Sequence, residues 1–173
     1  MSKKIAKTNA ARLLDKLRIP YNMHQVAVSE DDLSATTLAK ALNEDPRQVF
    51  KTLVVRGDPH GVCMALLPAD CALDLKALAR LSGNKNVAMV PLKEVFGLTG
   101  YIRGGCSPLA AKKPYPIFLD IHAMDFPTIF ISAGLRGVQL ELAPKDLILA
   151  CNPTLGSFTH TPETICVSNS SLL

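Results

Sequence analysis

Residues 49–56, Val-Phe-Lys-Thr-Leu-Val-Val-Arg, decide the fold class because they predict a strand whose partner follows directly behind it. β-Branched and aromatic residues dominate this run, as is typical of strands. The next five residues, Gly57–Gly61, contain Asp-Pro between two glycines and predict a turn. The apolar run Val62–Leu67 then returns as the second strand of a hairpin.

Helices and further strands are predicted on both sides of this hairpin. Apolar residues at helical spacing, or a capping residue, predict helices over residues 10–17, 34–42, 75–82, 91–96 and 144–150, with a helical turn after Asp45-Pro46. Short apolar runs predict strands over residues 21–28, 87–90, 116–120, 128–132 and 138–142. This alternation predicts a mixed sheet or barrel in an α/β or α+β domain.

The composition is that of a soluble globular protein. The 173 residues fit one domain, and 48% of them are hydrophobic and 20% charged. No apolar run approaches the roughly 18 residues that suggest a membrane span. The basic segment Met1–Lys7 lacks the apolar core of a secretory signal, so we expect a cytoplasmic protein without a membrane partner.

Net charge and cysteine content narrow the function classes further. The net charge of +4 weakly favours a polyanionic partner such as a nucleic acid, without establishing one. No pair of cysteines has the C-x-x-C spacing of a zinc or redox site, so we expect reduced thiols and no metal. The five cysteines are Cys63, Cys71, Cys106, Cys151 and Cys166.

The segment Gly100–Pro108, Gly-Tyr-Ile-Arg-Gly-Gly-Cys-Ser-Pro, is the strongest candidate for a functional loop. Glycine allows positive φ and close approach of another molecule, so the loop can present N–H groups to an anion or oxyanion. Cys106 raises a competing cysteine-hydrolase interpretation, which requires a nearby base. No family signature surrounds any of the four histidines, His24, His60, His122 and His160. We therefore expect the loop backbone, and not the Cys106 thiol, to take part in the chemistry.

Two further segments each allow a functional and a purely structural interpretation. Period two places Lys51 on one strand face with Val49, Leu53 and Val55, which predicts either a cation in a pocket or, if the other face is internal, a solvated lysine. The segment Ser132–Gly137 predicts either a plain β-turn or a second wall of backbone with Arg136 facing a phosphate.

Four motifs occur in a fixed order along the chain, namely Phe50–Leu53, Thr99–Pro108, Lys112-Lys113 and Ser132–Gly137. Together they resemble the YbaK family of prolyl-tRNA-editing-like deacylases, often called Cys-tRNA(Pro) deacylases. The resemblance extends roughly over residues 8–159. It implies a deacylase domain over residues 1–160, and we expect a flexible C-terminal tail over residues 161–173.

The resemblance implies a fold, an activity and a set of site residues. The fold is a single α/β domain whose mixed β-sheet curls into a barrel-like core with flanking helices. The activity is editing of aminoacyl-tRNA, chiefly removal of cysteine from Cys-tRNA(Pro) and also from Cys-tRNA(Cys), without a metal or another cofactor. The implied catalytic residues are Lys51 and Gly104. The implied substrate-binding residues are Thr52, Gly105, Cys106, Ser107, Pro108, Ser132, Ala133, Gly134 and Arg136.

The family mechanism requires no protein nucleophile. The thiol of the substrate cysteine attacks its own ester carbonyl and leaves as a cyclic thiolactone, so the enzyme holds this conformer and stabilises the oxyanion. By resemblance, Lys51 anchors the substrate near its terminal ribose, phosphate or carbonyl. Backbone N–H groups of Gly104–Ser107 face the developing charge, and the Ser132–Gly137 turn walls the pocket.

One position departs from the family pattern. Relatives often carry a tyrosine two residues after the histidine that matches His24, where this chain has Val26. Two other functions therefore stand beside Cys-tRNA(Pro) editing: removal of another small amino acid, such as alanine from tRNA(Pro), by water attack, or non-catalytic binding of tRNA or a synthetase. A complex with prolyl-tRNA synthetase is a further expectation, because free-standing editing domains are small.

Overall fold

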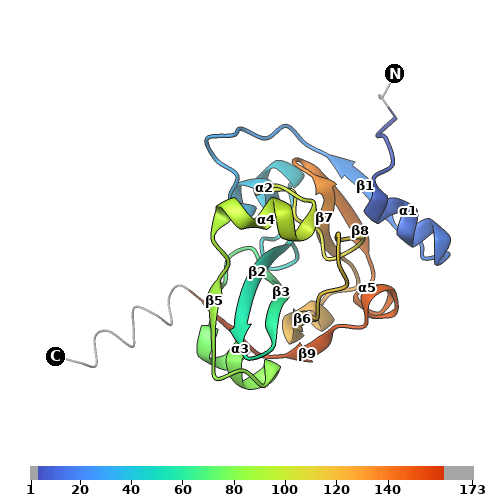
Figure 1. Cartoon of the computed structure of the whole chain (residues 1–173). Coiled ribbons are helices and arrows are strands. Elements are labelled where there is room, and N and C mark those ends of the chain that lie inside the picture. Colours follow the sequence, from blue (N-terminus) through green and yellow to red (C-terminus); the bar gives the residue numbers. More distant parts are fainter. Residues whose placement is uncertain (1–3, 162–173) are drawn as a thin grey trace.

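The computed structural model describes residues 4–161, and Figure 1 shows how their helices and strands are arranged. The helices in this range are α1 (Asn9–Lys16), α2 (Ala35–Leu42), α3 (Leu75–Ser82), α4 (Leu92–Thr99), the 3-10 helix η1 (Ile121–Asp125) and α5 (Pro144–Cys151). The strands are β1 (Asn22–Gln25), β2 (Phe50–Asp58), β3 (Gly61–Pro68), β4 (Ala72–Leu73), β5 (Asn86–Met89), β6 (Ile117–Asp120), β7 (Ile129–Leu135), β8 (Val138–Leu142), β9 (Thr154–Gly156) and β10 (Thr159–His160).

The strands form three hydrogen-bonded sheets within residues 4–161. The largest has the order β5-β2-β3-β6-β9, with β6 parallel to both of its neighbours and the remaining pairs antiparallel. An antiparallel sheet has the order β1-β8-β7, and β10 pairs with β4. A parallel bridge between Val49 and Phe130 links the start of β2 to β7. The predicted single mixed α/β domain is confirmed; the curl into a barrel is not confirmed, since the ladders are divided among three sheets.

Both faces of the central β2–β3 hairpin are buried. Leu67 belongs to the apolar cluster that contains Leu78 of α3, whereas its neighbour Leu66 belongs to the cluster that contains Ile131 of β7. Successive side chains of a strand point to opposite faces, so a strand covered on both sides reads as a continuous apolar run. This double burial explains why residues 62–67 show no polar alternation.

The predicted hairpin and all five predicted helices are present, with ends displaced by a few residues. The strand predicted over residues 21–28 is shorter, because its partner β8 begins at Val138, opposite Gln25. After Asp45 a hydrogen-bonded turn replaces the predicted helical turn, and the Gln48 N–H donates to the Asp45 carbonyl at 2.9 Å. The chain then extends directly into β2.

Four elements were not predicted, and each has only two to five residues. They are β4, β9, β10 and η1, and the strands among them depend on distant partners: β9 on β6, and β10 on β4. Of the predicted tail, all but Thr161 lies outside the described residues. None of the helices between residues 4 and 161 has the length and apolarity needed to cross a bilayer.

Candidate functional site

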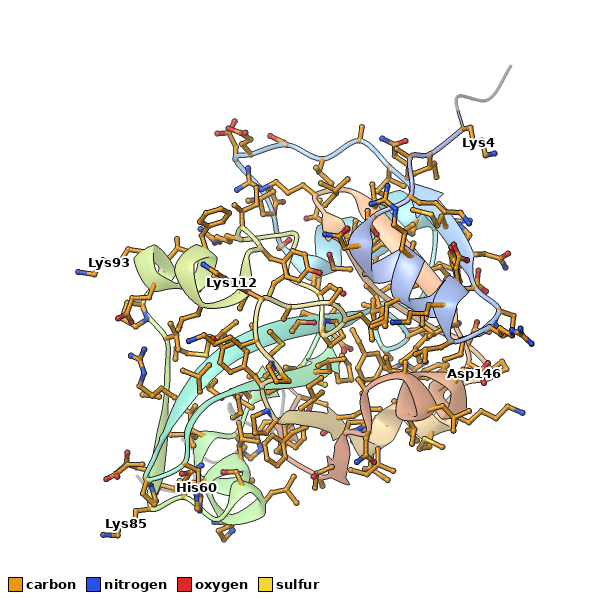
Figure 2. All side chains as sticks on the ribbon, turned by 45° about the vertical axis from the view of Figure 1, so that its right-hand side comes forward. Lys4, His60, Lys85, Lys93, Lys112 and Asp146 are labelled. Atoms are coloured by element: carbon orange, nitrogen blue, oxygen red, sulfur yellow. The ribbon has the colours of Figure 1, made fainter. Side chains whose placement is uncertain are left out.

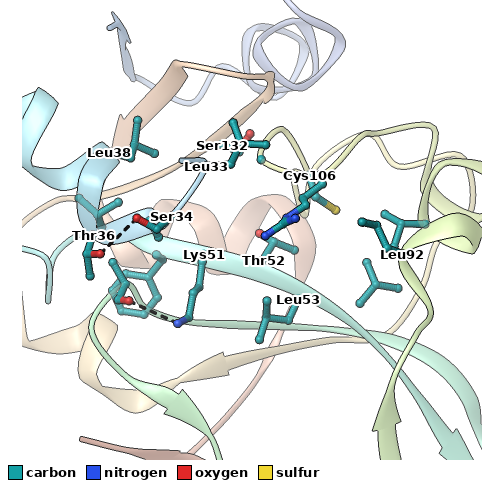
Figure 3. A pocket seen from close by; sticks show the side chains of 18 of the residues that line it. Leu33, Ser34, Thr36, Leu38, Lys51, Thr52, Leu53, Leu92, Cys106 and Ser132 are labelled. Atoms are coloured by element: carbon teal, nitrogen blue, oxygen red, sulfur yellow. Dashed lines mark hydrogen bonds between the residues drawn. The ribbon is translucent and has the colours of Figure 1, made fainter. Parts of the chain in front are cut away.

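A cavity of about 520 Å³ opens at the start of β2. Figure 1 shows α2 and α4 near this end of β2, and residues of both helices line the cavity. In Figure 3, its walls are seen to come from distant segments: Leu33 and Ser34 before α2, Lys51 and Thr52 in β2, Leu92 in α4, Cys106 in the glycine-rich loop and Ser132 in β7. The site is therefore assembled only by the tertiary fold.

Lys51 is half-buried in this cavity, and backbone carbonyls hold its ammonium. Nζ donates to the carbonyl oxygens of Cys71 at 2.6 Å and Ala69 at 3.3 Å. Burial lowers the pKa of the Lys51 ammonium, while the charges of Cys71 and Asp70 act in the opposite direction. An ammonium carries three N–H groups, so one remains for a ligand.

The position of Lys51 resolves the two alternatives that the sequence leaves open. It shares a face of β2 with Leu53 and Val55, which pack in the cluster covered by α3. The other face carries Phe50 and Val54, which are also buried. Lys51 is the second residue of β2, where the cavity opens. It is therefore neither enclosed by the core nor solvated on a free face.

Two buried polar atoms at the cavity have no hydrogen-bond partner among the described residues, namely Thr52 Oγ1 and Gln139 Oε1. Gln139 is only 1% exposed, and its amide nitrogen donates to the Val138 carbonyl at 3.3 Å. It lies opposite Ser132 in the β7–β8 ladder, and both residues line the cavity. A buried polar atom without a partner is costly, so these two residues shape the cavity wall at the expense of stability.

Sequence reasoning missed Gln139. Residues 138–142, Val-Gln-Leu-Glu-Leu, alternate apolar and polar side chains, so the pattern predicts a solvent-facing glutamine. The structure instead covers this face of β8 with the elements around the cavity. Nothing in the neighbouring sequence distinguishes Gln139 from a solvent-exposed glutamine on a surface strand.

The glycine-rich loop contributes backbone to the cavity. The Gly105 N–H donates to the Ile102 carbonyl at 2.9 Å and closes a turn in which Gly104 has φ +83°. The positive φ favours glycine at this position, and a β-carbon there would lie 3.3 Å from the side chain of Leu33. Between residues 4 and 161, the N–H groups of Gly104 and Cys106 donate no hydrogen bond.

The loop is packed closely against the turn between β7 and β8. A β-carbon at Gly105 would lie 3.1 Å from the backbone nitrogen of Arg136 and 3.2 Å from the carbonyl carbon of Leu135. Arg136 Nε donates to the Arg103 carbonyl at 2.8 Å, and its Nη1 pairs with Glu30 at 3.3 Å. Arg136 thus joins the two loops.

Cys106 lines the cavity but is not an activated nucleophile. Burial raises the pKa of its thiol to about 11, so the thiol stays protonated near neutral pH. None of the described residues that line the cavity is a histidine, an aspartate or a glutamate. The part of the chain that the structure describes also holds no group of three or more His, Cys, Asp or Glu side chains that could hold a metal ion.

The structure brings some of the predicted site residues together and separates others. Lys51, Thr52, Gly104, Cys106 and Ser132 line the cavity. The other predicted residues do not line it: Gly105, Ser107, Pro108, Ala133, Gly134 and Arg136. Among these, Ser107 Oγ accepts from the Leu109 N–H at 3.2 Å and so shapes the loop. Val26, the departure from the family pattern, does not line the cavity either.

Comparison with known families identifies this arrangement. A family model described as the aminoacyl-tRNA editing domain matches residues 30–149, which include every segment that lines the cavity. The chain belongs to the aminoacyl-tRNA editing domain family.

Individual relatives of this editing-domain chain agree with the assignment. It is 44% identical over 153 residues to an Enterococcus faecalis protein named "Putative Cys-tRNA(Pro)/Cys-tRNA(Cys) deacylase EbsC", with 88% of this chain and 93% of the relative covered. A solved structure described as "a putative trans-editing enzyme for prolyl tRNA synthetase" has the same fold, with a TM-score of 0.75 and 22% identity over 90% of this chain and 99% of the other. A second solved structure, of a hypothetical protein, gives a TM-score of 0.78 at 21% identity, covering 86% of this chain and 97% of the other.

The close packing of the two loops predicts a stability difference between two glycines. Gly105→Ala should lower the free energy of unfolding by about 1–3 kcal/mol, because a methyl group would overlap backbone that cannot rotate away. A β-carbon at Gly97 in α4 would meet no atom within 4 Å, so Gly97→Ala should raise the free energy of unfolding by about 0.5–1 kcal/mol. Urea denaturation measures both values; equal effects would contradict the packing described above.

The unpartnered hydroxyl predicts a stabilising substitution. Thr52→Val keeps the shape of the side chain and removes a buried polar atom, so the free energy of unfolding should rise by about 1 kcal/mol. Gln139→Met tests the neighbouring acceptor in the same way. A fall in stability on Thr52→Val would show that the hydroxyl already has a partner inside the protein.

Proposed function

We propose that this editing-domain protein deacylates Cys-tRNA(Pro), and also Cys-tRNA(Cys), in the cytoplasm. The observation that carries the proposal is a cavity with a half-buried ammonium and no imidazole or carboxylate among its described lining residues. Such a cavity can bind an ester and stabilise negative charge, but it offers no evident base to activate water. The name of the 44% identical relative supports cysteine as the amino acid.

The substrate supplies the nucleophile in the proposed reaction. The sulfur of the cysteinyl group bonds to its own ester carbonyl carbon, and the bond from that carbon to the ribose oxygen breaks. The thiol proton goes to the ribose oxygen, so the products are a cyclic thiolactone and tRNA with a free hydroxyl. Free cysteine has a thiol pKa of about 8.5, so a useful fraction is thiolate near neutral pH.

The protein contributes position and charge stabilisation. The third N–H of Lys51 is available to an oxygen of the terminal ribose, phosphate or carbonyl. The N–H groups of Gly104 and Cys106, which have no acceptor within residues 4–161, are candidates for the developing oxyanion. Ser132, Thr52 and Gln139 bound the space in which the amino acid folds back on its ester.

The domain extent and partner belong to the same proposal. The deacylase domain spans residues 1–160, and a complex with prolyl-tRNA synthetase supplies tRNA selectivity. The description of a similar solved structure as a trans-editing enzyme supports this partner. A direct binding measurement with purified prolyl-tRNA synthetase tests this partner.

A panel of three esters tests the proposed function. Purified protein should release cysteine from Cys-tRNA(Pro), and it should leave S-methylcysteinyl-tRNA(Pro) and Ala-tRNA(Pro) intact, because neither carries a free thiol. Release of alanine would instead support water attack on small amino acids. Binding of tRNA with all three esters intact would support a non-catalytic module.

Lys51 is predicted to be essential for this reaction. Lys51→Ala should reduce kcat/KM for Cys-tRNA(Pro) by about 100-fold or more, as loss of a charge-stabilising donor commonly does. The matched control is Lys85→Ala at the opposite end of β2, where the Lys85 N–H binds the Asp58 carbonyl; Figure 2 shows this lysine projecting outward.

Cys106→Ala distinguishes a nucleophilic thiol at Cys106 from a loop that acts through its backbone. This substitution should lower kcat/KM for Cys-tRNA(Pro) by no more than about tenfold, because it removes only a contact in the cavity wall. A thermal unfolding curve checks that each variant is folded. An inactive but folded Cys106→Ala protein would restore the cysteine-hydrolase interpretation.

A further inference from the structure

Phe96 stands apart from the other aromatic residues of the chain. It is 63% exposed, whereas the remaining five phenylalanines and all three tyrosines are buried or half-buried, and tryptophan is absent. Aromatic side chains contribute most to stability when they are buried. An aromatic ring left in water beside a functional cavity is therefore a candidate for contact with a ligand.

The ring of Phe96 continues an apolar strip that begins inside the cavity. Met89 and Leu92 line the cavity and are 48% and 57% exposed. Phe96 follows Leu92 by four residues, so it lies on the same face of α4, about 6 Å further along the helix. We name Met89, Leu92 and Phe96 the α4 strip. It leads from the cavity onto the surface.

Three cationic residues lie near the α4 strip. Lys93 lies in the first turn of α4, and the N–H of Lys112 binds the Thr99 carbonyl at the last turn, at 3.0 Å; Figure 2 shows both lysines beside α4. Arg103 lines the cavity itself. The carboxylate of the same helix, Glu94, is paired with Arg56 at 3.2 Å. The charges on the α4 side of the cavity are therefore mainly positive, while the acidic residues Glu30, Asp31 and Asp32 come directly before Leu33 on another wall.

We propose that the α4 strip binds the unpaired 3′ end of tRNA, with a base stacked on Phe96 and the flanking cations facing phosphates. This inference rests on the proposed function, since an ester bound in the cavity requires its nucleotides to leave through the mouth. An exposed aromatic among cations is the arrangement with which proteins bind single-stranded nucleic acid. The core of a protein–protein interface is instead depleted in lysine, which disfavours a protein at this strip.

A tryptophan at position 96 tests the inference without using catalysis. Phe96→Trp introduces the sole tryptophan of the chain, and its fluorescence should be quenched by uncharged tRNA(Pro) in a salt-sensitive manner. The same tRNA lacking its terminal CCA nucleotides should quench much less. Leu149→Trp is the matched control, because Leu149 is 75% exposed on α5 and does not line the cavity.

The outcomes separate this inference from the proposed function. Three results would each overturn the proposed binding of the tRNA 3′ end: equal quenching at positions 96 and 149, equal quenching by tRNA without its CCA nucleotides, or no quenching at position 96. A response to prolyl-tRNA synthetase alone would assign the strip to a protein and would also overturn it. Quenching by intact tRNA in a protein that removes no amino acid would support the binding surface while refuting the deacylase.

Kinetic variants provide a second readout in the active protein. Phe96→Ala should raise KM for Cys-tRNA(Pro) by about 5- to 150-fold, the range expected for loss of one stacked base, and leave kcat nearly unchanged. Phe96→Tyr should retain a wild-type KM, whereas Phe96→Leu should behave as Phe96→Ala does. Leu149→Ala is the control. A KM restored by leucine would show that apolar area, and not base stacking, is what matters.

Discussion

The backbone of Gly105 lies against the backbone of Leu135 and Arg136 without room for a side chain between them. The cavity depends on this contact, because it sets the position of the glycine-rich loop relative to the β7–β8 sheet. The bond from Arg136 to the Arg103 carbonyl spans the same junction. A wall made of backbone held in this way keeps its N–H groups in place before a substrate arrives, which is the condition for electrostatic preorganisation.

The chemistry of the cavity follows from the polar groups that are buried with incomplete hydrogen bonding or a shifted pKa. The ammonium of Lys51 has two carbonyl partners and a lowered pKa, and Thr52 and Gln139 each leave a buried oxygen without a donor among the described residues. The Cys106 thiol is protonated by the same desolvation. These groups favour binding and orientation over nucleophilic attack. An ester that carries its own thiol needs little more than that.

The double burial of the β2–β3 hairpin supports this site. Because one face packs toward α3 and the other toward β7 and β8, β2 is held firmly from both sides. Lys51 and Thr52 leave the strand on opposite faces, yet both line the cavity because it lies at the strand end. From the cavity outward, the α4 strip and the cations near it offer apolar and positively charged surface to a substrate that is part amino acid and part nucleic acid.

By itself, the sequence determined the local elements: the β2–β3 hairpin from its apolar runs, the helix over residues 34–42, and the glycine-rich loop from its glycines. It also indicated the family and Lys51. Only the tertiary structure decided that Gln139 faces the cavity and that Arg136 stays outside it. Burial and hydrogen-bond partners arise from segments far apart along the chain, and no local pattern encodes such contacts.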